Sequence, residues 1–206
     1  WKTAVNITKY DYVGITAHTP PENQENYIFW YIIGRYTGDG WYLKTKRKHR
    51  KNSYLYKFII CCGHHEFDNL REKLNLFGVH YNFTKTRAVY KFYICSQELV
   101  SFVEPIGKGA SNKILHPKLF HESLENIKAF LDGLWDSDGC VIGTKFKLST
   151  TSKKLALGVQ YLVQLVYNSP AKLYKIKTKP TCIIENRVCQ QKDWYQVVYD
   201  PNAVSY

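Results

Sequence analysis

One short pattern occurs twice in this chain of 206 residues. The segment YIIGRYTGDG covers residues 31–40, and FLDGLWDSDG covers residues 130–139. Each is an apolar, helix-like run that ends in a small residue, an aspartate and a glycine. The aspartates, Asp39 and Asp138, stand 138 − 39 = 99 residues apart, which is about the length of a small domain. The repeat predicts two copies of one structural unit, each beginning with such a helix.

The order of predicted elements supports the duplication. The first copy contains a helix, two strands, a helix, two strands and a short final helix, which fall within residues 22–40, 41–62, 66–78, 79–96 and 97–103. The second contains a helix ending at Ser137, a strand at 145–149, a helix at 152–168 and strands within 171–180, 181–186 and 194–199. We therefore predict an α+β protein with subdomains at 22–106 and 122–206, joined by a linker at 107–121.

Small residues recur four positions apart on both repeated helices. Gly34 and Gly38 form one such stripe, and Gly133 and Ser137 form the other. Two stripes of this kind let helix backbones pack closely, which would bring the aspartates that follow them together. Two carboxylates at negative helix ends call for a cation, and Mg²⁺ prefers carboxylate oxygens and water. A carboxylate pair of this kind suits phosphodiester hydrolysis, although Asp-Gly after a helix is also a common stop.

The charge of the chain favours a polyanionic partner. Lysine and arginine number 29 against 17 acids, a net charge of +12, and no apolar run approaches the length of a membrane span. Basic residues alternate with apolar ones along several predicted strands, so one sheet face could lie along DNA phosphates, the alternative being an ordinary solvated face. The candidate DNA-binding residues are Lys44, Lys46, Arg47, Lys48, Arg50, Lys57, Lys85, Arg87, Lys91, Lys145, Lys147, Lys175, Lys177, Lys179 and Arg187.

The six cysteines form no CxxC pair and show no zinc-ligand spacing. Adjacent Cys61 and Cys62 lie in a strand-like apolar run, where thiols behave as small hydrophobic groups. We expect reduced structural cysteines and hence a reducing, cytoplasmic location.

These motifs resemble those of the LAGLIDADG homing endonucleases in their single-chain, two-motif form. The interval SNKILHPKLFHESLENIKAFLDGLWDSDG (111–139) and the block LSTTSKKLALGVQYLVQLVYN (148–168) look like those of intein-encoded members. The opening WKTAVNITKYDYV, within residues 1–21, resembles the segment that joins an intein's splicing domain to its nuclease. Self-splicing itself is not expected, because no N-terminal nucleophile and no terminal His-Asn pair are visible.

The resemblance implies a pseudo-twofold αββαββα fold with two saddle-shaped antiparallel sheets, each sitting in the DNA major groove. It implies a monomer that uses two or three Mg²⁺ ions, held by Asp39 and Asp138 with Gly38 and Ser137, and leaves short 3′ overhangs at a long asymmetric site. Lys113 matches the basic catalytic residue of the family. The alternative is a non-cleaving binder of the same fold, such as an RNA maturase or a DNA-binding regulator.

The second copy departs from the family pattern. Its own basic residue would fall 113 − 39 = 74 positions after Asp138, at 212, beyond Tyr206. Lys192 is the substitute candidate, and it could equally be a solvated or DNA-facing lysine. Thr151 is a candidate for positioning water or phosphate, although Ser and Thr there also cap helices.

Overall fold

The computed structural model describes residues 26–47, 53–184 and 187–201. The predicted linking segment at 1–21, together with Lys48 and Arg50, lies outside these ranges. The first half contains α1 (Tyr27–Asp39), β1 (Gly40–Lys46), β2 (Tyr54–Gly63), α2 (Phe67–Phe77), β3 (Asn82–Lys85), β4 (Val89–Ile94) and α3 (Gln97–Val103). The second contains α4 (Leu124–Asp138), β5 (Gly139–Ile142), β6 (Lys145–Thr150), α5 (Lys153–Tyr167), β7 (Lys172–Ile176), β8 (Thr181–Ile184), β9 (Arg187–Gln190) and β10 (Trp194–Tyr199).

The two halves build the same kind of sheet. The strands run in the order β1-β2-β4-β3 in one sheet and β5-β6-β10-β7 in the other, and every pairing is antiparallel. Strands at corresponding places in the chain occupy corresponding places in the two sheets. The α+β class predicted from the repeat, and the two antiparallel sheets implied by the family resemblance, are thereby confirmed, and each sheet has four strands.

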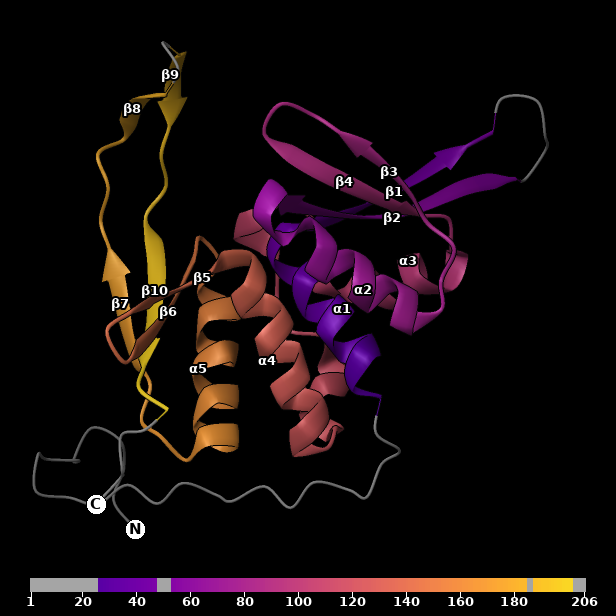
Figure 1. Ribbon diagram of the computed structural model, residues 1–206. Helices are drawn as coiled ribbons and strands as arrows, with labels where there is room; N and C mark the ends of the chain where they lie inside the picture. Colours follow the sequence, from indigo (N-terminus) through magenta and orange to yellow (C-terminus); the bar gives the residue numbers. More distant parts are fainter. Residues whose placement is uncertain (1–25, 48–52, 185–186, 202–206) are drawn as a thin grey trace, which may run out of the picture.

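The second half differs from the sequence prediction in two strands, β5 and β9. β5 follows α4 directly and pairs with β6, and its sequence GCVI shows no alternation of apolar and polar residues from which a strand could be predicted. β9 pairs with β8 in a separate two-stranded ribbon that extends the β7–β10 hairpin. Figure 1 shows this ribbon rising beyond the rest of its sheet.

Helices α1 and α4 lie side by side at the centre of the molecule (Figure 1). Every residue of α1 from Trp30 to Thr37 is buried, so this helix is covered on all sides and shows no polar face. Both helices run from the lower part of Figure 1 to its centre, and their C-terminal ends meet between the two sheets. The fold thus places the ends of the two repeated segments together.

Local sequence explains where the helices begin and end. Asn26, Ser123 and Ser152 each accept a hydrogen bond from a backbone N–H of the first turn of α1, α4 and α5. Gly78 ends α2 with a positive φ of 73°, a conformation that favours glycine.

The predicted linker at 107–121 is packed against the core. It contains two 3₁₀ turns, Ala110–Asn112 and Pro117–His121, and it buries Leu115 and Leu119. Its passage between the halves also buries Lys113.

Candidate active site at the ends of the two central helices

The backbones of α1 and α4 touch at their glycines. A Cβ atom on Gly34 would overlap the carbonyl oxygen of Phe130 and lie 2.8 Å from Leu134 N. A Cβ on Gly133 would overlap the carbonyl oxygen of Tyr31 in the same way. Further along, a Cβ on Gly38 would overlap Ser137 Oγ. The four small residues of the predicted stripes therefore all lie at the helix contact.

This contact brings the two aspartates together. Asp39 and Asp138 are the last residues of α1 and α4, and a Cβ on Gly38 would lie 3.2 Å from Asp138 Oδ2. Burial raises the pKa of Asp39, against the opposing effect of Arg35 and Lys113. The Asp138 carboxyl group stays accessible to solvent, yet partial desolvation and then repulsion by Asp39 raise its pKa to about 6. Two carboxylates thus share one small region at negative helix ends.

Lys113 lies beside this acid pair. Its side chain is only 8% exposed, and Nζ donates to the carbonyl oxygens of Gly38 at 2.5 Å and Tyr36 at 3.3 Å. Burial lowers its pKa, while attraction to Asp138 and Asp39 opposes that shift. Its own carbonyl oxygen accepts a hydrogen bond from the Ser152 hydroxyl at 2.6 Å, which ties it to the second half.

Lys192 and Thr151, the two catalytic candidates of the second copy, make fewer contacts near the acid pair than Lys113 does. Lys192 is exposed, and its Nζ lies 3.4 Å from Ser111 Oγ. Thr151 is half-buried between β6 and α5, and its neighbour Ser152 is the residue that caps α5. Their proposed roles in the reaction stay predictions.

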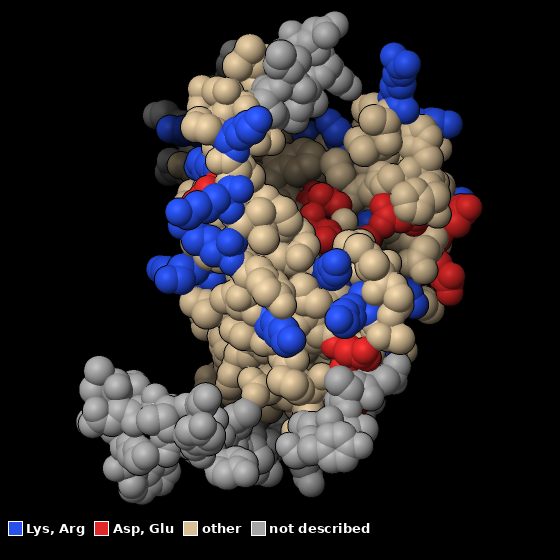
Figure 2. Space-filling view, turned by 90° about the vertical axis from the view of Figure 1, so that its left-hand side faces the viewer, with Lys and Arg blue, Asp and Glu red and all other residues tan. Residues whose placement is uncertain are grey.

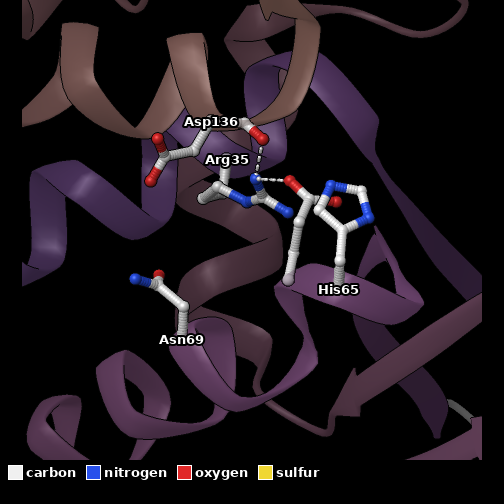
Figure 3. Close-up of a pocket in the computed structure, with 5 residues that line it drawn as sticks. Arg35, His65, Asn69 and Asp136 are labelled. Carbon is white, nitrogen blue, oxygen red and sulfur yellow. Dashed lines mark hydrogen bonds and ion pairs between the residues drawn. The ribbon is translucent and has the colours of Figure 1, made fainter.

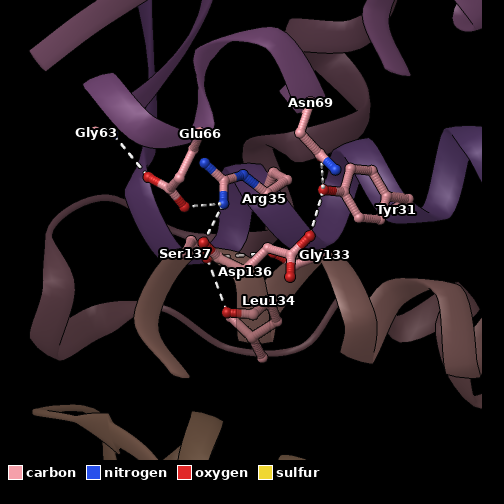
Figure 4. Close-up of polar contacts among 9 residues, drawn as sticks. All are labelled: Tyr31, Arg35, Gly63, Glu66, Asn69, Gly133, Leu134, Asp136 and Ser137. Carbon is pink, nitrogen blue, oxygen red and sulfur yellow. Dashed lines mark hydrogen bonds and ion pairs between the residues drawn. The ribbon is translucent and has the colours of Figure 1, made fainter. Parts of the chain in front are cut away.

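Arg35 was missed by the sequence interpretation. It is 1% exposed, and its Nη1 donates to Glu66 Oε1 at 2.9 Å and to the Asp136 carbonyl oxygen (Figure 4). The Tyr31 hydroxyl donates to Asp136 Oδ2 at 2.6 Å, so Asp136 is held at both its backbone and its side chain. The sequence does contain one indication of this role: Arg35 is a charged residue inside an otherwise apolar helix, and buried arginines are almost always paired.

A polar cavity of about 320 Å³ adjoins Arg35 (Figure 3). The lining residues are Arg35, His65, Glu66, Asn69 and Asp136. Nε and Nη2 of Arg35 are buried without a protein acceptor. A cavity of this size holds water, which can accept from these donors.

The pleat of the sheets separates the candidate DNA-binding residues into two groups. Lys57 and Lys91 lie on the face opposite buried Phe58 and Phe92, together with Cys61, which pairs with Lys91. Lys145 and Lys147 lie on the corresponding face of the second sheet. Lys172 shares that face, because it and Lys147 both stand opposite Val198, and the sequence interpretation did not select it.

The other group lies on the helix side of the sheets. Its members Lys44, Lys46, Lys85 and Lys175 stand opposite Tyr56, Tyr54, Tyr90 and Tyr195. Lys44 pairs with Glu104 at 3.2 Å, and Lys175 pairs with Asp193 at 3.1 Å. Arg47, Arg87, Lys177 and Lys179 are exposed and lie outside the strands, and the side chain of Arg187 is not among those described.

Basic and acidic side chains are segregated on the surface. Figure 2 shows acidic side chains gathered at the edge of a hollow, with lysine and arginine side chains on both sides of it. An anionic polymer would meet attractive charge beside the hollow and a cation would be attracted into it.

The chemistry of the acid pair suits a hard divalent cation. Asp39 and Asp138 offer carboxylate oxygens whose mutual repulsion a cation relieves, and the carbonyl oxygens of Gly38 and Ser137 lie one residue before them. No group of three or more His, Cys, Asp or Glu that could bind a metal occurs within residues 26–47, 53–184 and 187–201. Water and a phosphate would therefore complete the coordination, as Mg²⁺ accepts readily.

Two further observations bear on the sequence predictions. Among the cysteines whose side chains the structure describes, Cys61, Cys62, Cys95, Cys140 and Cys189 are free. Among the helices in the described part of the chain, none is long and apolar enough to cross a membrane.

Comparison with known proteins agrees with this architecture. The model of the LAGLIDADG-like domain matches residues 125–195. The uncharacterized protein MJ1054 of Methanocaldococcus jannaschii is 28% identical, over 66% of this chain and only 16% of its own length. The chain therefore spans less than a fifth of that relative.

Solved structures share the fold at low sequence identity. A structure of mesophilic variants of the homing endonuclease I-DmoI has a TM-score of 0.60 and 14% identity, covering 84% of this chain and 83% of its own. I-DmoI in complex with DNA and Ca has a TM-score of 0.59 and 16% identity over the same shares. The second half of the chain thus contains a LAGLIDADG-like domain, and over most of its length the chain has the fold of I-DmoI, with two motif helices that touch at their glycines.

Proposed function

We propose that this protein is a site-specific endonuclease that cleaves double-stranded DNA with Mg²⁺. One observation carries the proposal: Asp39 and Asp138, 99 residues apart in sequence, converge at the ends of two helices between two basic sheets. A protein that only binds DNA gains nothing from a repulsive acid pair at negative helix ends. Similarity to I-DmoI, which has been solved with DNA and with Ca or Mn, supports both the substrate and the use of a divalent ion.

Each residue of the site has a role in this proposal. Asp39 and Asp138 hold the ions, with the Gly38 and Ser137 carbonyl oxygens beside them. Mg²⁺ bound there would lower the pKa of the attacking water and stabilise the leaving oxygen. Lys113, kept close to the acids by its bonds to Tyr36 and Gly38, places positive charge where the transition state gains negative charge.

The two sheets would bind on either side of the cut. Lys57, Lys91, Lys145, Lys147 and Lys172 on their outer faces contact phosphates, and polar neighbours select bases in the major groove. A single acid pair must serve both strands, so the two scissile phosphates lie close together across the minor groove, and the products carry short 3′ overhangs. A monomer with two unlike halves suits a long asymmetric site. An adjoining intein splicing domain stays a prediction of the sequence resemblance.

A cleavage selection tests the proposal. The protein and its Asp39→Asn/Asp138→Asn double variant are incubated with a randomised duplex library, with Mg²⁺ or with Ca²⁺, and all broken ends are sequenced. Breaks at one asymmetric sequence, made only by the unaltered protein with Mg²⁺, are the expected result. Enrichment of a bound sequence without breaks would contradict cleavage and leave the non-cleaving binder as the function.

A further inference from the structure

We infer that Arg35 is the second basic residue of the acid pair, a positioning residue that holds the end of α4 as Lys113 holds the end of α1. The inference rests on the proposed function, since it assigns a role in the same site.

The two residues make equivalent contacts on the two helices. Lys113 donates to the carbonyl oxygens of Tyr36 and Gly38, in the last turn of α1 before Asp39. Arg35 donates to the carbonyl oxygen of Asp136, in the last turn of α4 before Asp138. In the 99-residue register of the motifs, Asp136 corresponds to Thr37, which lies between the two acceptors of Lys113. Each central helix therefore ends in a turn in which backbone carbonyls accept from a buried cation that comes from outside that helix.

Such contacts are favourable for general reasons. The last carbonyls of a helix lack partners within the helix and carry partial negative charge, so a cation there is stabilising. Both cations are almost fully buried, Arg35 at 1% and Lys113 at 8% exposure, so neither is an ordinary surface charge. Arg35 also counters the negative charge of both aspartates.

Arg35 is itself fixed from outside the motif helices. Glu66 accepts from Arg35 Nη1 at 2.9 Å, and its second oxygen accepts from Gly63 N at 2.7 Å. Glu66 thereby anchors the guanidinium to the junction between β2 and α2. The position of Asp138 is thus linked to the first half of the chain as well as to the second.

The network is present on one side of the pseudo-twofold axis only. The residues that correspond to Arg35 and Asp136 in the other motif are Leu134 and Thr37. Arg35 contacts the end of α4 and Lys113 contacts the end of α1. Replacing Arg35 should therefore displace Asp138, replacing Lys113 should displace Asp39, and each replacement should slow the cleavage of a different DNA strand.

Strand-specific nicking measures this difference. The substrate is a supercoiled plasmid carrying the site recovered by the selection, with each strand labelled separately. Arg35→Met is paired with Glu66→Gln, which leaves no unpaired buried charge and keeps an acceptor for Gly63 N–H. Lys113→Met is the matched control on the other helix, and Arg35→Lys keeps the charge with a single donor group.

We expect the Arg35→Met/Glu66→Gln variant to cut one strand about 10- to 100-fold more slowly and to accumulate nicked plasmid, because small displacements of reacting groups cost about this much. Lys113→Met should slow the opposite strand more, and Arg35→Lys should recover part of the lost rate. Equal slowing of both strands, no slowing, or slowing of the same strand by both variants would overturn the inference. A general loss of stability would not select one strand, and melting curves of each variant check that the assay temperature lies below unfolding.

The two proposals fail in different ways. If the unaltered protein does not cleave any sequence, the proposed function is wrong and the role of Arg35 falls with it. If the unaltered protein cleaves and its Arg35 variants keep the normal balance between strands, only the role of Arg35 is wrong.

Discussion

At the scale of single residues, the acid pair is an unfavourable arrangement in the absence of a cation. Asp138 has a pKa of about 6 instead of 3.8, so the folded protein binds this proton more tightly than the unfolded chain does. Its contribution to stability is therefore most favourable at low pH and declines as the pH rises from about 4 to 6. Above that range the ionised carboxylate opposes folding until a cation binds.

The first prediction concerns the stability of the metal-free protein. Asp138→Asn should unfold at a higher urea concentration than the unaltered protein at pH 7, because it removes the repelling charge. The difference should shrink as the pH falls below 6, where Asp138 is already neutral. Asp132→Asn, an exposed acid on the same helix, is the control and should change the unfolding free energy by less than about 0.5 kcal/mol. A destabilised Asp138→Asn protein at pH 7 would contradict close, repelling carboxylates.

The second prediction concerns metal binding at the same residue. Protons and cations compete for the Asp138 carboxylate, so Ca²⁺ affinity should fall by up to about tenfold per pH unit below pH 6 and level off above it. Calorimetric titration of the protein with Ca²⁺ at several pH values measures this dependence. Asp138→Asn should bind weakly and lose the part of the pH dependence that belongs to this group. An affinity that is constant between pH 5 and 7 would show that Asp138 does not bind the ion.

At the scale of elements, the packing of α1 on α4 decides whether the site forms. The third prediction is that Gly34→Ala destabilises the protein by about 3 kcal/mol, because the added methyl group overlaps the Phe130 carbonyl oxygen and neither backbone can move freely. Urea unfolding measures the loss. Gly78→Ala is the matched control, since no atom lies within 4 Å and only the positive φ is strained, at about 1–2 kcal/mol. Equal losses in the two variants would argue against a tight helix contact.

The central helices were predictable because local sequence determines them. The small residues and the terminal aspartates stand at fixed spacing, and packing of the helices then brings Asp39 and Asp138 together without further information. Arg35 and Glu66 were not predictable as a pair, since their contact depends on how the junction at Gly63 folds over α1. The edge strand β5 and the ribbon strand β9 were not predicted, because pairing with β6 and β8, and not an alternation in their own sequences, makes them strands.

At the scale of the whole molecule, the net charge of +12 should make DNA binding strongly dependent on salt. The fourth prediction is that Lys147→Ala lowers the slope of log K against log salt by about 1, because one phosphate contact on the outer face of the second sheet is lost. Lys128→Ala is the control, because this lysine lies on α4, away from the sheet faces, and pairs with Asp132. The salt dependence of DNA binding by this variant should equal that of the unaltered protein. Fluorescence anisotropy over a range of salt concentrations measures both. Equal slopes for Lys147→Ala and the unaltered protein would show that the outer face of the second sheet does not contact DNA phosphates at this position.

The long hairpin that projects from the sheet is a different one in the two halves. β1 and β2 form the long hairpin of the first half, whereas β5 and β6 are joined closely by Gly143 and Thr144. In the second half the long hairpin is β7–β10, which the β8–β9 ribbon extends, whereas β3 and β4 are joined by the short turn 86–88. The extended chain from Ile176 to Ile184 can span about 26 Å, the length of about eight base pairs. The DNA contacted by the second half should therefore extend further from the cut along this ribbon.

Shortening the ribbon tests that expectation. Residues 178–192 are replaced by Asn-Gly, a two-residue turn that can join Lys177 to Asp193 because Ile176 already pairs with Trp194. The hydroxyl-radical footprint should shorten on one side of the cut only, with weaker binding and an unchanged cleavage rate at saturating enzyme. The cleavage rate also tests Lys192, because this variant lacks it. A loss of cleavage on fully bound DNA would support a catalytic role for Lys192. A symmetric loss of footprint would instead show that the ribbon stabilises the sheet without touching DNA.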